Sequence, residues 1–149
     1  VYGFLLCGGL SSNPKAIKEE ELNDRCDGNY IQWLGYRSDV PDLLRSSHII
    51  AFPSYYREGV PKSLIEATAI GRPIVTTNSI GCKDTVEDGV NGFLIPIKDS
   101  KALAEKLRIL IDDADLRKRM GLNSRQIAER DFSLDDVIAK HLAIYELMY

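Results

Sequence analysis

The chain has 149 residues, of which 44% are hydrophobic and 28% are charged, with a formal net charge of −3 at pH 7. This length fits one domain with a core of useful size, and we treat residues 1–149 as a single domain. The 19 basic residues are outnumbered by 22 acidic ones, and nothing in the sequence suggests the basic face of a nucleic-acid-binding protein. No apolar stretch reaches 18 residues, so the sequence predicts no transmembrane helix.

Short apolar runs alternate with helical patterns along the chain. Strands are expected at residues 3–7, 30–34, 48–52, 73–76 and 93–95. Helices are expected at residues 14–26, 40–46, 61–70, 83–87, 100–111, 115–130 and 133–148. This alternation predicts βαβ units and the α/β class, with a doubly wound parallel sheet whose strands are buried on both faces. We expect the last helices to pack against that sheet.

Three helix starts carry capping signals. Ser100 is the expected N-cap of its helix, and Ser133 with Asp136 forms a partial capping box. The Asp113-Ala114-Asp115 triplet joins two late helices, and we expect it to cap the second one. We therefore predict no metal site there.

The three cysteines, at positions 7, 26 and 82, lack the spacing of metal ligands. An odd, scattered set of cysteines is typical of free thiols in a reducing cytoplasm. The chain also opens almost inside a strand and without an initiator Met, which predicts a piece of a longer chain.

Two carboxylates, Glu58 and Glu66, are the most informative pair of residues. Glu58 lies in a Gly/Pro turn after an apolar strand, and Glu66 lies in the helix that begins near Pro61. That helix start offers free N–H groups between the two acceptors, which is a suitable place for a phosphate. Taken alone the spacing means little, because helix dipoles favour early Glu residues in any case. The segment nevertheless predicts a site for a ribose, a diphosphate and a sugar.

The surrounding residues carry a resemblance. Residues 53–77, which include Glu58-Gly59-Val60-Pro61-Lys62-Ser63, resemble the retaining GT-B glycosyltransferases of family 4. Residues 81–96 look like the family's turn-helix and Asn-Gly turn, and residues 31–40 also fit. The resemblance covers nearly the whole chain and implies the nucleotide-sugar-binding, C-terminal half of a GT-B enzyme, of the type that builds bacterial surface polysaccharides.

The resemblance also implies roles for single residues. Glu58 would contact the donor sugar, as the candidate catalytic residue and not as an acid/base, and Glu66 would bind the ribose hydroxyls. Backbone amides of Lys62 and Ser63 would meet the diphosphate, with Gly59 and Val60 completing this donor loop. Many members have Gly where this chain has Pro61, which has no N–H to donate.

Two further loops follow the first two expected strands, at the sheet edge where ligands bind in such folds. Gly8 and Gly9 either line the site or only turn the chain from strand to helix. Tyr36 could stack on a uracil, and in the resembling family this loop lies beside the base. Arg37 either shares that role or pairs with Asp39 or Asp42.

The resemblance implies retaining transfer of a sugar from a nucleotide diphosphate sugar, preferably a UDP-hexose or UDP-N-acetylhexosamine, to a saccharide or lipid-linked acceptor. The nucleotide sugar is a substrate, and we expect no cofactor and no nucleic-acid partner. An Arg/Lys pair and an acceptor domain would precede the first residue, so we expect no transfer by this chain alone. We expect a cytoplasmic protein, with peripheral association at the inner membrane face through that preceding part. A non-hydrolysing epimerase and a non-catalytic α/β interaction domain are the alternatives.

Overall fold

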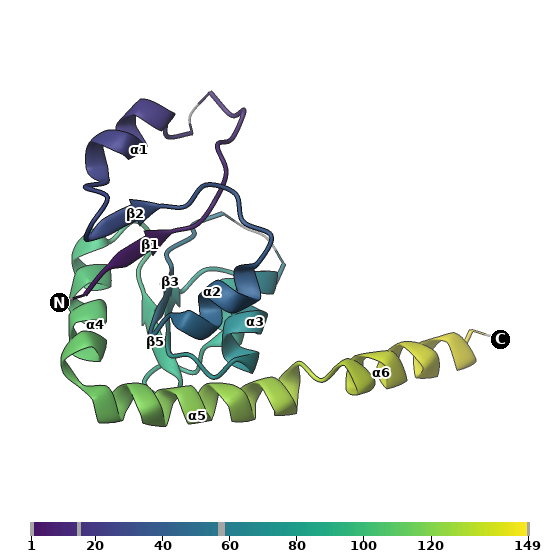
Figure 1. Ribbon diagram of the computed structural model, residues 1–149. Coiled ribbons are helices and arrows are strands. Elements are labelled where there is room, and N and C mark those ends of the chain that lie inside the picture. The colour runs from purple at the N-terminus through teal and green to yellow at the C-terminus, as the bar shows by residue number, and fades with distance from the viewer. Residues whose placement is uncertain (1, 15, 57–58, 149) are drawn as a thin grey trace. The chain divides into compact units, whose positions relative to one another are not determined.

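The computed structural model describes residues 2–14, 16–56 and 59–148. Within them the chain divides into two compact units, unit 1 over Val1–Val40 and unit 2 over Pro41–Tyr149. Figure 1 shows the helices and strands of both units. Each unit is a parallel βαβ arrangement, described separately below.

Unit 1 holds two strands and one helix. Strand β1 (Phe4–Leu6) pairs in parallel with β2 (Ile31–Trp33), and helix α1 (Glu19–Arg25) connects them. The helix begins later than residue 14, with three glutamates in its first turn, where the helix dipole favours acidic side chains. The chain then turns into β2 around Asp27, whose Oδ1 accepts hydrogen bonds from the backbone amides of Asn29, Tyr30 and Ile31 at 2.7–2.9 Å.

Unit 2 holds a three-stranded parallel sheet in the order β3-β4-β5. Its strands are β3 (Ile50–Phe52), β4 (Ile74–Thr77) and β5 (Gly92–Ile95). Its helices are α2 (Val40–Ser46), which starts at the boundary, α3 (Lys62–Ala69), the 3₁₀ helix η1 (Cys82–Thr85), α4 (Ser100–Asp112), α5 (Ala114–Asp131) and α6 (Leu134–Glu146). All four residues of β4 are buried, as expected for a central strand covered on both faces.

The core of unit 2 lies between the sheet and the late helices. Val75 of β4, Ile95 of β5, Leu110 of α4 and Met120 of α5 form one buried cluster. Partly buried Leu103 and Leu107 of α4 extend it, at the helical spacing that gives one apolar face. This cluster fixes α4 and α5 against the strands.

A buried polar network joins α5 to the turn before β4. Ser124 donates to the carbonyl of Arg72 at 2.7 Å, and Asn91 Nδ2 donates to the carbonyl of Thr85 at 3.0 Å. Helix and turn also approach closely through two glycines, because a Cβ on Gly121 would lie 2.5 Å from the carbonyl oxygen of Gly71. The turn between α3 and β4 is therefore held by α5.

The α/β class, the parallel pairing and every expected helix and strand are confirmed, with boundaries shifted by a few residues. In the part of the chain that the structure describes, the strands pair as two ladders and not as one doubly wound sheet. Two expected caps are wrong: Asp99, not Ser100, caps α4 by accepting from the Ala102 amide at 2.9 Å, and Ser133 makes no side-chain cap. Asp113 does cap α5, accepting from the Leu116 amide at 2.8 Å.

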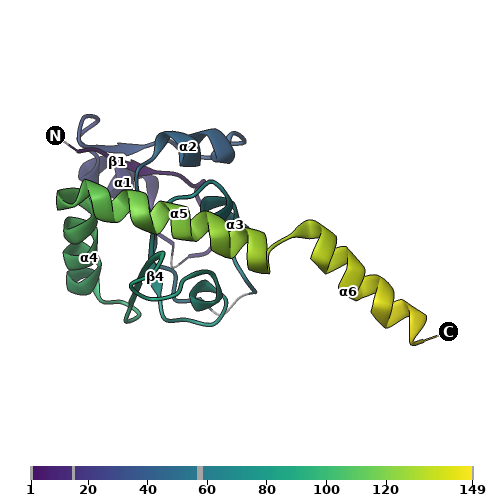
Figure 2. The ribbon, with the colours of Figure 1, turned by 90° about the horizontal axis from the view of Figure 1, so that it is seen from below.

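Helix α6 differs from the expectation that the last helices pack on the sheet. It follows α5 at the C-terminal end of unit 2 (Figure 2), and none of its described residues is buried. Its apolar side chains, such as Leu134 and Leu142, are 71% and 56% exposed. The apolar spacing predicts this helix correctly, but the helix has no buried face among its described residues.

Candidate functional site

The carboxyl edge of the β3-β4-β5 sheet is organised by two threonines of β4. Thr76 Oγ1 donates to the carbonyl of Phe52 at 2.7 Å, and Thr77 Oγ1 donates to the carbonyl of Ser54. Thr77 Oγ1 also lies 2.9 Å from Ser79 Oγ in the loop after β4. These buried hydroxyls hold the start of the loop after β3 in place at the edge where ligands bind in open α/β sheets.

That loop leads into the N-terminus of α3. Pro61 is the N-cap residue, and its carbonyl accepts from the amides of Leu64 and Ile65 at 3.0 and 3.2 Å. Lys62 and Ser63 are the first two helical residues, whose N–H groups have no acceptor within an α-helix. Because the helix dipole is positive at this end, the two amides favour an anion such as a phosphate.

Glu66 lies one turn further along α3. Its side chain is 27% exposed, and Lys62 Nζ lies 3.5 Å from its Oε1. Leu64, Ala67 and Thr68 are fully buried on the inner face of the helix, and Thr68 Oγ1 donates to the carbonyl of Leu64 at 2.6 Å. The helix is thus fixed, with a carboxylate that is accessible but partly enclosed.

The prediction that Glu66 lies within the helix after the loop is confirmed. Glu58, the first carboxylate of the pair, lies outside the described residues, so its predicted exposure at the edge stays a prediction. Gly59 and Val60 lie in the exposed segment just before Pro61. The donor roles of Gly59, Val60, Lys62, Ser63 and Glu66 also stay predictions.

In unit 1 the structure brings the two predicted loops together. The Gly8 amide donates to the carbonyl of Gly35 at 2.9 Å, and Trp33 Nε1 donates to the carbonyl of Gly8 at 2.9 Å. A Cβ on Gly9 would lie 3.5 Å from Cβ of Tyr36, whose side chain is 81% exposed. The loops that follow β1 and β2 therefore form one continuous surface, on which the Tyr36 ring is exposed.

Arg37 forms an ion pair with Asp39. Its Nε and Nη2 lie 2.7 and 2.5 Å from the two carboxylate oxygens of Asp39. This bidentate ion pair holds the pKa of Asp39 below its usual range and raises the pKa of Arg37. The predicted pairing of Arg37 with Asp39 is therefore present in the structure.

The sequence reading missed a cluster at the carboxyl edge of unit 2. Tyr55 and Tyr56 stack with ring centroids 4.6 Å apart, and Lys98 Nζ lies 4.8 Å from the centroid of the Tyr55 ring. In the sequence, the only feature that indicates this cluster is the aromatic pair Tyr55-Tyr56 shortly after a strand. Nothing in the sequence around Lys98, 43 residues beyond Tyr55, indicates a contact with that pair.

A hollow of about 570 Å³ lies at the opposite, amino edge of the same sheet. Basic side chains line it, including His48, Arg72, Arg117 and Arg125. The three arginines donate to carbonyls at the C-terminal ends of α2, α4 and α3, respectively. Cations are favourable at helix C-termini, so these side chains are explained by capping.

Among the described helices, none is both long and apolar enough to cross a membrane. The Asp113-Ala114-Asp115 triplet has a structural role in capping α5, as described above.

The family of the chain follows from comparison with known proteins. The model of the family "Glycosyl transferases group 1" matches residues 3–127. The chain therefore belongs to the glycosyl transferases group 1 family.

Curated relatives agree with this family. The chain is 34% identical over 148 residues to the N,N'-diacetylbacillosaminyl-diphospho-undecaprenol alpha-1,3-N-acetylgalactosaminyltransferase of Campylobacter jejuni, covering 93% of the chain and 38% of the relative. It is 41% identical over 129 residues to the capsular polysaccharide biosynthesis glycosyltransferase CapM of Staphylococcus aureus, covering 87% of the chain and 34% of the relative. The chain thus spans little more than a third of the length of these relatives.

Solved structures share the fold. The chain resembles HepE of Anabaena in complex with UDP, with a TM-score of 0.82, 28% identity, and coverage of 95% of the chain and 41% of HepE. It also resembles a glycosyltransferase from Rickettsia africae, with a TM-score of 0.85, 27% identity, and coverage of 98% and 40%. The fold is therefore that of GT-B glycosyltransferases, as the sequence predicted.

Proposed function

We propose that this chain is the donor-binding part of a retaining glycosyltransferase. Its substrate is a nucleotide diphosphate sugar, preferably UDP-hexose or UDP-N-acetylhexosamine, and the acceptor is a saccharide or a lipid-linked sugar of surface polysaccharide synthesis. The observation that carries the proposal is the start of α3 at the carboxyl edge of the sheet, where two amides without an acceptor in the helix and a partly enclosed carboxylate lie within five residues.

The chemistry of α3 fits such a donor. The amides of Lys62 and Ser63 provide donors for diphosphate oxygens, and the exposed Lys62 ammonium adds a positive charge. The Glu66 carboxylate accepts hydrogen bonds only, which suits the two hydroxyls of a ribose. The helix rises about 1.5 Å per residue, so Glu66 lies about 6 Å along the axis from Lys62, the scale of the distance between ribose and diphosphate.

Catalysis in this proposal rests on the leaving group. Negative charge grows on the diphosphate as the bond to the sugar breaks, and the α3 amides are oriented toward it before the reaction begins. Glu58 holds the sugar by its hydroxyls and takes no part as an acid or base.

The names of relatives support the choice of substrates. The Campylobacter relative is named for transfer to a diphospho-undecaprenol-linked sugar. An Escherichia coli relative, 30% identical over 75% of this chain, is named for transfer from UDP-Gal to GlcNAc-diphosphoundecaprenol. HepE was solved with UDP and with UDP-glucose.

Calorimetric titration of the chain with UDP, GDP and UDP-N-acetylglucosamine tests the binding proposal. We expect UDP and its sugar to bind and GDP to bind more weakly. Equal binding of UDP and GDP would contradict the preference for uracil, and no binding of any of them would contradict a nucleotide-sugar site. The anomeric configuration of the product, read by NMR from the protein that contains this chain, tests retention.

A further inference from the structure

The hollow at the amino edge of the β3-β4-β5 sheet is lined by charged side chains of one sign. Its volume of about 570 Å³ is within the usual range of small-molecule sites. Among the described residues no Asp or Glu lines it, although the whole chain has 22 acidic residues and 19 basic ones. The basic residues that line it are His48, Arg72, Arg117, Lys118 and Arg125.

Helix capping explains where two of these arginines lie, but it uses only part of each guanidinium. Arg72 donates through Nε and Nη2 to two carbonyls at the end of α2. Arg117 donates through Nη1 alone, to two carbonyls at the end of α4 at 2.5 and 2.8 Å. A guanidinium has five N–H groups. Nη1 of Arg72 and the Nε and Nη2 atoms of Arg117 therefore have no acceptor among the described residues and are available to a ligand.

The positive charge of the hollow is not balanced by carboxylates. The same two arginines form no ion pair within the described part of the chain. Lys118 pairs with Asp115 at 4.0 Å and Arg125 pairs with Glu129 at 2.7 Å, but both are exposed pairs of a kind that contributes little. Neither carboxylate lines the hollow, and each helix end carries only about half a negative charge. The cations therefore exceed the negative charge that faces them.

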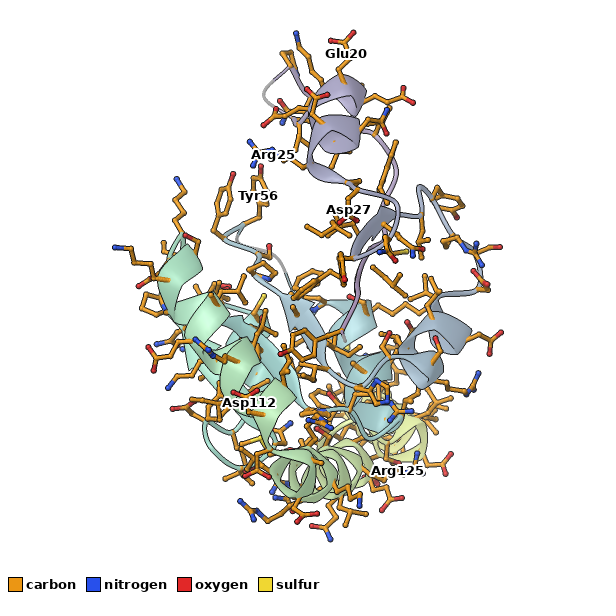
Figure 3. The ribbon with its side chains drawn as sticks, turned by 60° about the vertical axis from the view of Figure 1, so that its left-hand side comes forward. Glu20, Arg25, Asp27, Tyr56, Asp112 and Arg125 are labelled. Atoms are coloured by element: carbon orange, nitrogen blue, oxygen red, sulfur yellow. The ribbon has the colours of Figure 1, made fainter. Side chains whose placement is uncertain are left out.

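The hollow is separate from the candidate donor site. His48 and Arg72 precede β3 and β4, whereas the donor motif follows β3. Figure 3 shows Arg125 of α5 at the opposite end of unit 2 from Tyr56, which lies in the loop after β3. A ligand in the hollow therefore leaves the carboxyl edge of the sheet open.

We propose that this hollow is a binding site for a phosphate group, carried by a soluble small molecule or by the headgroup of an anionic lipid. The donors come from two separate elements, Arg72 from the turn before β4 and Arg117 with Lys118 from α5. A phosphate has oxygens that point in several directions and accepts from both elements, whereas a carboxylate has two oxygens in one plane. Ile70 and Leu122 also line the hollow and provide apolar contacts for the rest of the molecule.

NMR titration of the protein that contains this chain with sodium phosphate tests the site. Sodium chloride at the same ionic strength is the reference for screening by salt. We expect saturable shifts in the amide signals of Arg72 and residues 117–125, and much smaller shifts with sodium acetate. The shifts should persist in excess UDP, because the donor motif lies at the other edge of the sheet.

Two variants of α5 separate the hollow from general electrostatic attraction. Lys118→Glu reverses a charge in the hollow at a side chain that is 80% exposed, and it should raise the Kd of phosphate on the order of tenfold. Arg119→Glu is the matched control, since it makes the same change of charge at the next residue, which is exposed and does not line the hollow. Its Kd should change by less than about twofold, because exposed charges without contact to the ligand are screened.

Sedimentation with vesicles distinguishes the two sources of the phosphate. If the group belongs to a lipid headgroup, the protein should sediment with phosphatidylglycerol vesicles and not with phosphatidylcholine vesicles, and Lys118→Glu should weaken this binding more than Arg119→Glu. If the group belongs to a soluble molecule, phosphate should produce the shifts without any binding to vesicles.

Four results would overturn the site. They are the absence of both phosphate shifts and vesicle binding, equal losses in the two variants, shifts with acetate as large as those with phosphate, and loss of the phosphate shifts when UDP is added. The last result would place the phosphate in the donor site. Binding of UDP by the wild type does not depend on the hollow, so the proposed function stands or fails separately.

Discussion

Replacing Glu66 by alanine should weaken nucleotide binding greatly and leave folding nearly unchanged. If the carboxylate accepts two hydrogen bonds from the ribose hydroxyls, the variant loses two charge-assisted bonds worth roughly 1.5–3 kcal/mol each. Since about 1.4 kcal/mol is a factor of ten, the Kd of UDP should rise on the order of a hundredfold or more.

The structure predicts the small effect on folding. Glu66 pairs with Lys62 at 3.5 Å, and the Lys62 side chain is 89% exposed. An i,i+4 pair with one fully solvated partner contributes roughly 0.3–0.5 kcal/mol, and less when the lysine precedes the glutamate. Alanine has the higher helix propensity, which offsets part of this loss. The free energy of unfolding should therefore change by no more than about 0.5 kcal/mol.

Calorimetric titration of UDP and 2′-deoxy-UDP against wild type and Glu66→Ala measures the contact itself. The deoxy analogue should lose much of its binding to the wild type but little more to the variant, because both changes remove the same contact. Glu129→Ala is the matched control, since it breaks another i,i+4 pair, with Arg125 on α5. Purely additive losses at Glu66 would refute the assigned ribose contact.

Three further predictions concern the sugar, the packing and the pH dependence. Glu58→Ala should weaken UDP-sugar more than UDP in calorimetry, and equal losses would contradict a sugar contact. Gly121→Ala places a Cβ against the Gly71 carbonyl. The overpacking cost of about 1–3 kcal/mol should outweigh the helix-propensity gain of about 1 kcal/mol, so the variant should be less stable in urea melts. Leu122→Ala, at an exposed position of the same helix, should not be destabilised in this way. The backbone amide of Ile31 and its neighbours hold the pKa of Asp27 below its ordinary 3.8, so this carboxylate stabilises unit 1 above that pH and the contribution is lost as pH falls through the lower folded pKa. Asp27→Asn should flatten that loss in acid unfolding curves, and an unchanged acid limb would contradict it.

Local signals fixed the elements and the donor motif. Apolar runs flanked by Gly or Pro predicted all five strands within one or two residues, and Pro61 marked the start of α3 because proline is tolerated at a helix start and not inside. The Arg37–Asp39 pair was also among the readings, since two residues of chain keep these charges within reach of each other.

The sequence was less informative about which residue caps a helix and whether a helix face is covered. Ser100 and Asp99 are both good caps, and only the backbone path after β5 decided that Asp99 accepts the Ala102 amide. The apolar spacing in α6 predicted its helix correctly, but spacing does not say whether an apolar face is covered.

Contacts between distant residues were decided by the tertiary structure alone. Tyr55 and Lys98 are brought together because parallel strands deliver their following loops to the same edge, on either side of β4. The approach of Gly121 to Gly71 likewise depends on how α5 crosses the turn before β4. The sequence by itself determined the family, the elements and the α3 motif, because those depend on neighbouring residues. The aromatic–cation cluster required the fold, because nothing in either loop specifies its partner.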